Sequence, residues 1–432
     1  MIMKSRKAIA VWAAVLAAGA HPAFLNAQAA SYTVTDLGTL PGGNFSQATM
    51  NNNLGIVTGV STVADGSQHA TLWVGGQPLD MATAGLGGPN SYALGMSPGG
   101  VSAGAAETAN ADPYNENFCD YFTGLSCVPF IWQADTGMKA LPLPGGNNGE
   151  AGPVNALGQI VGIAETGTVD PNCPGILAPN GTGPQVLDFA PVVWDPGAKQ
   201  ARILKLPGSD TVGAALWSND SGQVVGTTGT CANSYPPPFC AGPHAVFWDR
   251  DGSVHDVGSL GGTANPAIEG VGNMAFAINN RGQVTGGSAL PGSQTIHAFL
   301  WMQASGMQDL GTVGGDPWSV GLAMNDRGDI VGASVDGPVS TGNPRAAIWQ
   351  NGKAADLNAL VPADTSLYLL VAFGINNAGQ IVGFGVDFNS GEVHGFLASP
   401  IAGSGGPAAR GPINHVALGA AARNDVLRRI RF

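Results

Sequence analysis

Apolar and polar residues of this 432-residue chain alternate in short segments that return in the same order seven times. In each copy a short apolar segment leads into the pattern Asn/Ser-x-x-Gly-x-x-x-Gly, whose second half carries Val or Ile. Asn followed three residues later by Gly is typical of a tight turn, because the Asn side chain can close an Asx-turn and Gly accepts a left-handed backbone. Each copy therefore predicts strand, turn, strand; the copies begin at Asn52, Ser97, Asn155, Asn219, Asn279, Asn325 and Asn376.

Each copy is followed by a third apolar segment, such as HATLW or HAFLW, and by a fourth, such as MQDLGTV. The spacing between copies runs from 45 residues (Asn52 to Ser97) to 64 residues (Asn155 to Asn219). Units of four short strands at this period are typical of a β-propeller.

The two ends of the repeat array complement each other. The last unit has three segments and ends at HGFLASP, whereas YTVTDLGTL near the N-terminus is a fourth segment with no unit before it. An N-terminal strand that completes the last blade would close the ring and remove its exposed edges. We therefore predict an all-β fold, a seven-bladed β-propeller over residues 32–399 with four antiparallel strands per blade, the last blade being closed by the N-terminal strand.

The segments HAFLW, DLGT and INNAGQIVG resemble the HAF family of bacterial extracellular repeats. The resemblance covers residues 32–399, and units 2 to 4 depart from it most, since they lack DLG and two of them lack the His. It implies an exported repeat protein without an assigned activity, and so adds location and fold rather than chemistry.

Residues 1–29 predict a secretory signal peptide. Lys4, Arg6 and Lys7 precede an apolar run over residues 8–20, and the small-residue site AQA follows. His21 and Pro22 interrupt that run before it reaches the roughly 20 residues that a membrane span needs, and no later segment predicts a span. We expect a monomer that is secreted, periplasmic or on the cell surface.

Composition agrees with a turn-rich β protein, since 66 Gly accompany 44% hydrophobic and only 11% charged residues. The net charge is −12, and eight of the 17 Lys and Arg lie in the signal peptide or in the tail, 400–432, a Gly/Pro linker followed by a basic segment. Nucleic acid is not an expected partner, because phosphate binding needs clustered cations. The basic tail either touches an anionic surface or docks on its own acidic body.

The five cysteines lie in three long insertions between the second and third segments of units 2, 3 and 4, over residues 107–127, 165–190 and 227–243. The stretches CDYFTGLSC and CANSYPPPFC predict two local disulfides, Cys119–Cys127 and Cys231–Cys240. Cys173 is left over, either as a free thiol or as a partner that displaces this pairing.

We expect the ligand-binding residues on these insertions, because they should lie side by side on one face and loops commonly carry function. Carboxylates and aromatic rings there suit an extracellular glycan or protein ligand. Ca²⁺ would also suit oxygen ligands, but no dense calcium loop and no Cys/His metal spacing occurs, so we expect no cofactor and no metal site. The candidates, which include one blade-to-blade loop, are Asp112, Glu116, Asp120, Tyr121, Glu165, Asp170 and Trp318.

The expected function is a binding or scaffold module. One alternative is a carbohydrate-active hydrolase or lyase that uses two carboxylates of the same face; another is a purely structural surface or matrix protein. The sequence contains no His-Glu-x-x-His or Walker motif, which favours binding over catalysis. A convergent acid pair would favour the enzyme, and an aromatic patch without such a pair would favour binding.

Several recurring residues have a structural interpretation. His69, His244, His297 and His394 begin the third segment of their units, at places that a propeller distributes around a ring rather than around one ion. We expect them to be hydrogen-bonded structural residues, and we expect the recurring Asp of the fourth segment to accept from a backbone or indole N–H. Trp217 stands where other inner strands have a small residue. Packing against a neighbouring blade is favoured there over a channel plug or a platform for a sugar.

Overall fold

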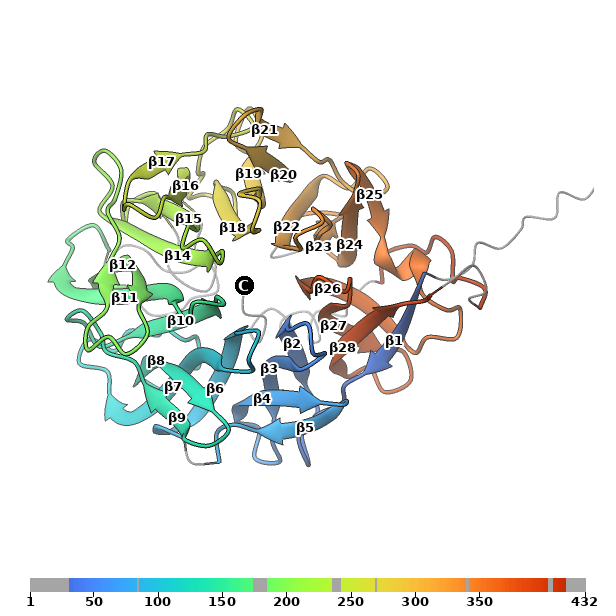
Figure 1. Cartoon of the computed structure of the whole chain (residues 1–432), viewed down its shortest axis with the longest axis horizontal. Helices are drawn as coiled ribbons and strands as arrows, with labels where there is room; N and C mark the ends of the chain where they lie inside the picture. Colours follow the sequence, from blue (N-terminus) through green and yellow to red (C-terminus); the bar gives the residue numbers. More distant parts are fainter. Residues whose placement is uncertain are drawn as a thin grey trace, which may run out of the picture.

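The computed structural model describes residues 31–416 except 84, 174–184, 235–241, 269, 339–341 and 403–406, so the predicted signal peptide lies outside the described residues. Seven four-stranded antiparallel sheets surround a common axis, and the predicted seven-bladed propeller is confirmed (Figure 1). The last blade connection contains a 3₁₀ turn, η2 (Leu357–Leu360). No helix of the described chain is long and apolar enough to cross a bilayer.

Every blade runs from an inner strand at the axis to an outer strand at the rim. The strands of blades 1 to 3 are β2 (Ser46–Asn51), β3 (Val57–Thr62), β4 (Gln68–Val74), β5 (Gln77–Asp80); β6 (Gly87–Met96), β7 (Ser102–Ala111), β8 (Leu125–Gln133), β9 (Gly137–Ala140); β10 (Gly149–Val154), β11 (Ile160–Val169), β12 (Leu187–Trp194) and β13 (Arg202–Ile203). Those of blades 4 to 6 are β14 (Val212–Ser218), β15 (Val224–Gly229), β16 (His244–Trp248), β17 (Val254–Asp256); β18 (Met274–Ile278), β19 (Val284–Ala289), β20 (Ile296–Met302), β21 (Gly306–Asp309); β22 (Trp318–Met324), β23 (Ile330–Val335), β24 (Pro344–Gln350) and β25 (Lys353–Asp356).

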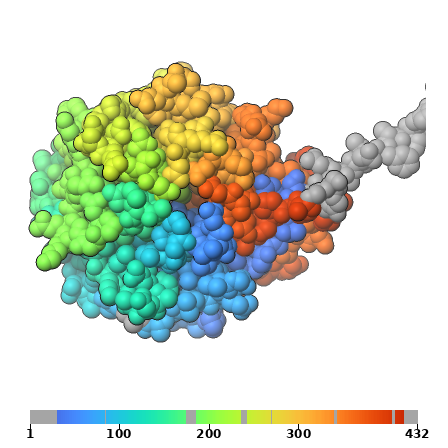
Figure 2. All heavy atoms as spheres, viewed as in Figure 1, coloured from blue at the N-terminus to red at the C-terminus, as the bar shows by residue number. Residues whose placement is uncertain are grey.

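Blade 7 consists of β26 (Leu367–Ile375), β27 (Ile381–Asp387), β28 (Val393–Pro400) and the N-terminal β1 (Tyr32–Asp36). β1 pairs antiparallel with β28, from Tyr32 opposite Pro400 to Asp36 opposite Phe396. The predicted closure by the N-terminal strand is thus confirmed, and Figure 2 shows the first blade (blue) in contact with the last (red).

Both glycines of the repeated motif have a steric reason. The first one, for example Gly55, closes the β-hairpin with φ +75°, and all seven equivalents have positive φ. The second one, for example Gly59, faces the inner strand so closely that an added Cβ would overlap the carbonyl oxygen of Gln47, and the same holds in the other six blades. Any larger residue there would push the inner strand away from the second strand.

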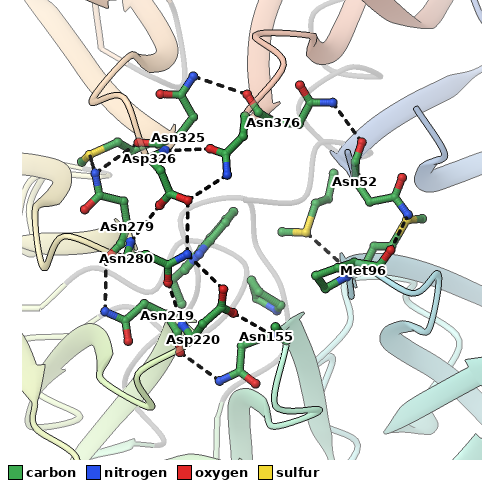
Figure 3. A pocket seen from close by; sticks show the side chains of 18 of the residues that line it. Asn52, Met96, Asn155, Asn219, Asp220, Asn279, Asn280, Asn325, Asp326 and Asn376 are labelled. Atoms are coloured by element: carbon green, nitrogen blue, oxygen red, sulfur yellow. Dashed lines mark hydrogen bonds between the residues drawn. The ribbon is translucent and has the colours of Figure 1, made fainter. Parts of the chain in front are cut away.

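The motif Asn links neighbouring blades. Its Oδ1 accepts from the backbone of its own turn, as predicted: Asn52 accepts from Leu54 N at 3.0 Å and Ile56 N at 3.1 Å. Its Nδ2 donates to a carbonyl of the next blade, which the sequence did not reveal. Six such links, 2.9 to 3.4 Å long, join the blades in series from blade 3 round to blade 2 (Figure 3): Asn155 to Asn219, Asn219 to Asn279, Asn279 to Asn325, Asn325 to Asn376, Asn376 to Asn52 and Asn52 to Pro98. Within the described chain the series is open between blades 2 and 3, where Ser97 replaces Asn.

These hairpin turns define one end of the central channel, called here the turn end; the end that carries the β7–β8, β11–β12 and β15–β16 loops is the insertion end. Each inner strand has a β-bulge two or three residues before its motif Asn. A bulge re-aims its residue, and here one residue or more from every bulge lines a cavity of about 90 Å³ on the axis: Thr49, Leu94, Gly152, Pro153, Leu216, Phe276, Leu322 and Phe373.

Trp217 follows the bulge of blade 4 and lines both this cavity and a second one at the turn end. Its ring packs against three separate core clusters, which belong to blades 1 and 2, blades 4 and 5, and blades 6 and 7. The favoured interpretation, packing against a neighbouring blade, is confirmed by the contact with blade 5, and the contacts with the other two clusters go beyond it. Trp217 reaches across the axis, where the residues of several blades converge.

The recurring histidines are structural, as predicted. His69, His297 and His394 each place Nδ1 2.9 to 3.0 Å from the Asp carboxylate of the adjacent outer strand. His244 departs from this pattern and bonds Asp210 of a blade-to-blade loop at 2.8 Å. The recurring Asp also accept from backbone N–H groups, as Asp36 does from Gly38. The indole N–H groups of Trp73, Trp194 and Trp248 donate to main-chain carbonyls instead, for instance Trp73 to Leu37 O at 2.8 Å.

The described part of the tail after Pro400 docks on the insertion end beside blades 6 and 7. The Arg410 side chain donates to Leu367 O at 3.1 Å, and its backbone N–H donates to Val361 O at 2.8 Å. His415 lies 2.9 Å from Asp316. Ile413 and Val416 pack against the largest core cluster, which draws residues from all seven blades. The apolar core at this end of the channel is therefore covered partly by the chain's own tail.

Candidate functional site

The insertion end of blades 2 and 3 is built on two extended strands. β7 and β11 have ten residues each, whereas β3 has six. The first residues of the predicted insertions are thus strand, and the true loops begin at Asp112 and Asp170. Both loops consequently start well above the ring formed by the other blades.

Two disulfides brace these loops. Cys119–Cys127 is present as predicted and closes the β7–β8 loop. The predicted Cys231–Cys240 bond is wrong, because Cys231 is bonded to Cys173; Cys240 lies outside the described residues. The two bonded cysteines are 58 residues apart in sequence, and both side chains are fully buried between the loops of blades 3 and 4. The packing of blade 3 against blade 4 brings them together, which local spacing could not indicate.

Glu116 and Glu165, both predicted ligand residues, meet in a buried pair at the junction of blades 2 and 3. Oε1 of Glu116 accepts from Leu187 N at 2.9 Å, from Val186 N at 2.7 Å and from the Gln185 side chain at 3.1 Å. Glu165 is fully buried and accepts from the backbone and side-chain nitrogens of Asn148 and from Gln185. The carboxyl groups therefore join the β7–β8 loop to blade 3 instead of facing solvent.

The pair holds a proton at neutral pH. Burial raises the pKa of Glu116 to about 8, and the neighbouring Glu165 carboxylate adds to the increase. Burial also raises the pKa of Glu165. Oε2 of Glu116 has no donor within the described chain, and a proton held between it and Glu165 satisfies both oxygens. The two carboxyl groups thus act as a hydrogen-bonded unit.

Asp112 and Asp120 shape the β7–β8 loop. Asp112 accepts from Tyr114 N at 2.9 Å, from Glu116 N at 3.0 Å and from the Asn148 side chain at 2.8 Å. Asp120 takes a left-handed backbone, with φ +58°, and accepts from Asn117 at 3.0 Å. Both side chains are buried, so these predicted ligand residues hold the loop.

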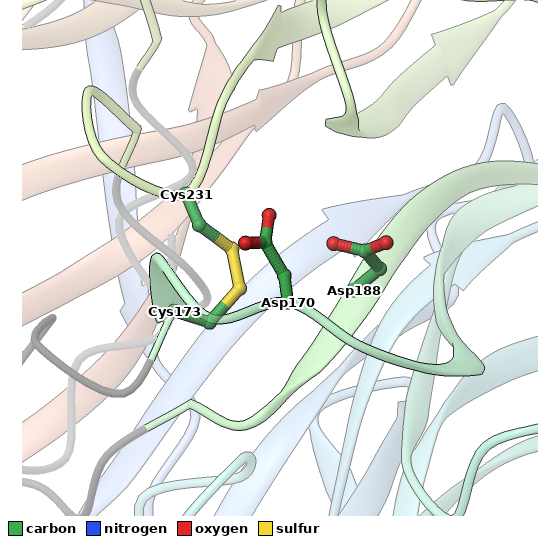
Figure 4. A group of neighbouring side chains, drawn as sticks. All are labelled: Asp170, Cys173, Asp188 and Cys231. Atoms are coloured by element: carbon green, nitrogen blue, oxygen red, sulfur yellow. A yellow bond between two sulfur atoms is a disulfide. The ribbon is translucent and has the colours of Figure 1, made fainter.

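Asp170, the next predicted residue, lies beside the second disulfide. Its carboxylate stands between the Cys173–Cys231 bond and Asp188 (Figure 4). Burial raises the pKa of Asp188 to about 6, helped by the nearby Asp170. One ligand atom from each of the four residues lies within 4.8 Å of the others, a spacing that suits a metal ion. With the two sulfurs bonded to each other, the two carboxylates are the groups left to bind a cation.

The aromatic candidates divide into buried and exposed residues. Trp318 is 3% exposed and belongs to the largest core cluster, so it offers no surface for stacking. Tyr121 is partly buried and contacts Tyr92, with ring centroids 6.1 Å apart. Two other aromatic side chains of the β7–β8 loop do face solvent: Phe122 is 56% exposed, and Tyr114 is 44% exposed.

Phe122 combines that exposure with an unusual backbone, since its φ is +58°. Three of the five described non-glycine residues with positive φ lie between positions 115 and 122, namely Asn115, Asp120 and Phe122. The Phe122 N–H donates to Asn117 Oδ1 at 2.7 Å, and the Cys119–Cys127 bond closes the loop around it. Positive φ in a bulky residue is rare and persists only where the surroundings enforce it.

The comparisons with known proteins leave the chemistry open. No family model matches the chain and no curated protein matches it in sequence, so the HAF resemblance stays a prediction. Among solved structures, an oligogalacturonate lyase in complex with manganese has a TM-score of 0.49 and 12% identity over 87% of this chain and 96% of that one. Dipeptidyl peptidase 4 of Porphyromonas gingivalis has a TM-score of 0.34 and 10% identity over 77% of this chain and 50% of that one. Likenesses this distant carry no argument about a ligand.

Proposed function

We propose that the protein is an exported binding module that docks a protein partner on the insertion end of blades 2 to 4, with Phe122 as an anchor. The observation that carries the proposal is the exposed, left-handed Phe122 inside a disulfide-closed loop. Such a conformation costs on the order of 1 to 3 kcal/mol, and exposure of the ring forgoes its burial as well. A fold that maintains both has a use for that ring at the surface.

The exposed chemistry of this face favours a protein partner. Tyr114, Phe122 and Val169 are each about half exposed, whereas the carboxylates Asp112, Glu116 and Glu165 are turned inward. Aromatic side chains are enriched at the centres of protein interfaces, where charged groups are depleted. The two disulfides hold the loops before the partner arrives, which reduces the entropy lost on binding.

The carboxyl pair favours binding over hydrolysis. In glycoside hydrolysis two carboxyl groups flank the scissile bond and lie about 5 to 9.5 Å apart. Glu116 and Glu165 instead share a hydrogen bond, are at most 2% exposed and accept from loop amides. Their geometry serves the junction between the loops.

Two features support export, one in the structure and one in the sequence. The two disulfides are typical of proteins from oxidising compartments. Residues 1–29 have the charged start, apolar run and small-residue site of a signal peptide.

The test uses a peptide array and a glycan array probed with the full chain and with two variants. Phe122→Gly removes the ring and relieves the backbone, so it should raise the unfolding free energy by roughly 1 kcal/mol while abolishing peptide binding. Asn351→Gly is the matched control, because Asn351 also has positive φ (+52°) but lies in the β24–β25 turn, away from the insertion end. This variant should bind like the unmodified chain.

Peptides that bind the full chain and Asn351→Gly, but not Phe122→Gly, would support the proposal. Binding of glycans alone in the same Phe122-dependent way would overturn the assignment to a protein partner. Peptide binding that does not depend on Phe122, or no peptide binding at all, would reject this face as the docking surface.

A further inference from the structure

We propose that the turn end of the channel holds a second binding site, which takes the terminal residue of a neutral glycan chain. The site is a cavity of about 160 Å³ surrounded by the seven hairpin turns (Figure 3). Trp217 forms its base, since this residue lines both this cavity and the axial cavity next to it. The site is at the opposite end of the channel from Phe122 and does not depend on the function proposed above.

Trp217 provides a fixed apolar surface. Its ring is partly exposed to the cavity and is held by packing against core clusters from three sides of the ring. A large aromatic ring that is already immobile loses little entropy when a ligand packs on it. The C–H face of a pyranose is a ligand surface of this kind, flat and apolar but bordered by hydroxyl groups.

The rim provides oriented hydrogen-bonding groups. Asp220, Asn280 and Asp326 are linked in series, because Asn280 Nδ2 donates to Asp220 at 3.0 Å and to Asp326 at 3.2 Å. Their other atoms accept from backbone N–H groups of neighbouring turns, for example Ala156 N to Asp220 at 2.8 Å. A carboxylate has about four lone-pair positions, so both Asp can accept further bonds. Hydroxyl groups of a sugar are the matching donors.

Two further atoms in the wall call for a partner. Asn51 Oδ1 and Ser218 Oγ belong to residues that line the cavity and are less than a tenth exposed. Neither atom has a hydrogen-bond partner within the described chain. Buried polar atoms without a partner are rare in folded proteins, and ordered water commonly supplies the missing bond.

The charges of the site select among ligands. None of the described residues lining the cavity is Lys or Arg, while two are Asp, so an anionic ligand is disfavoured. Cationic ligands are typically held by several aromatic faces, whereas Trp217 is the single aromatic residue among the described lining residues. A neutral hydroxylated ring uses both the indole and the amide and carboxylate rim. Because Trp217 lies at the base, only the end of a glycan chain fits.

The test is a calorimetric titration of the full chain with neutral monosaccharides and β1,4-linked disaccharides (glucose, galactose, mannose, N-acetylglucosamine). Spermidine and galacturonic acid serve as cationic and anionic probes. Ala156→Trp places a bulky side chain at an exposed position of the rim, where no side-chain hydrogen bond is lost. Leu157→Trp is its matched control, being the next residue of the same turn but not among the lining residues. Trp217→Leu removes the base, with circular dichroism as the check on folding.

A neutral sugar should bind the full chain and Leu157→Trp equally, and Ala156→Trp at least about tenfold more weakly, equivalent to about 1.4 kcal/mol. A folded Trp217→Leu should show a loss of similar size. The proposal is overturned if no neutral sugar binds, if only spermidine or galacturonic acid binds, or if Ala156→Trp binds as well as Leu157→Trp. Neither result bears on the peptide array with Phe122→Gly, so the two proposals fail separately.

Discussion

The two ends of the channel are stabilised in different ways although the same seven blades form both. At the turn end, copies of one element repeat round the axis, and a single amide of each Asn copy links its blade to the next. At the insertion end, three unlike loops are held by two disulfides and a buried carboxyl pair. The same hydrogen bond can link successive blades only where the repeats are alike. Where the chain departs from its repeat, each loop is held by contacts of its own.

The ends also differ in what they expose. At the insertion end, part of the tail packs on the apolar core. Phe122 and Tyr114 of the β7–β8 loop face solvent there. The turn end leaves a polar cavity over Trp217. This contrast suggests that a broad protein surface would be recognised at one end and a single small ring at the other.

The largest effect is expected from the disulfide that joins two blades. Cys173→Ala combined with Cys231→Ala frees a loop with a sequence separation of 58, and should lower the unfolding free energy by about 4 kcal/mol. Cys119→Ala with Cys127→Ala, at a separation of 8, should lower it by only about 2.5 kcal/mol. Urea denaturation of both double variants measures the difference. Equal losses would show that the inter-blade bond does not hold the insertion end as described.

An intermediate effect is expected at the turn end, where Asn376 joins blade 7 to blade 1. Asn376→Ala removes its bonds to Asn52 O (2.9 Å) and from Gln380 N (2.9 Å), and should cost about 2 to 3 kcal/mol because the groups left behind are buried. The control is Asn53→Ala, an exposed residue that accepts one bond from Asn377 N, with a cost below about 1 kcal/mol. Similar costs in thermal denaturation would contradict a special role for the inner ring.

The smallest change in unfolding free energy, taken per pH unit, is expected from the titration of Glu116. It should arise at the insertion end alone. Between the ordinary Glu pKa of 4.5 and about 8, folded Glu116 binds a proton that the unfolded chain has released. The unfolding free energy should therefore fall as pH rises through this window, by up to about 1.4 kcal/mol per pH unit. Glu116→Gln keeps the hydrogen bonds without the charge and should reduce the slope, whereas the exposed Glu392→Gln should not. Parallel slopes for all three chains in urea titrations would rule out the shared proton.

The fold was predictable because its evidence is local and repeated. The motif glycines, the apolar segments and the split last unit each follow from one blade's geometry, and seven copies reinforce them. The site was less predictable. Glu116 and Glu165 were each predicted as ligand residues, but their pairing, and the amides of Asn148 and Gln185 that bind them, depend on other positions of the chain.

The errors have the same origin. Cys231 and Cys240 are near in sequence, yet the partner of Cys231 is Cys173 of the neighbouring blade. Trp318 was predicted to lie on an exposed blade-to-blade loop, but its ring is buried in the largest core cluster. The sequence does not indicate the left-handed backbone of Phe122, because positive φ is normally predicted from Gly, Asn or Asp and not from a bulky residue.

The sequence by itself determined that the chain forms seven four-stranded units and how they close, because turns, strand periods and steric demands for glycine act over a few residues. Only the tertiary structure decided which cysteines pair, which carboxyl groups are buried together and where Trp217 lies. Those features depend on atoms from blades that are distant in sequence, and they exist only once ring closure brings the blades together around one axis.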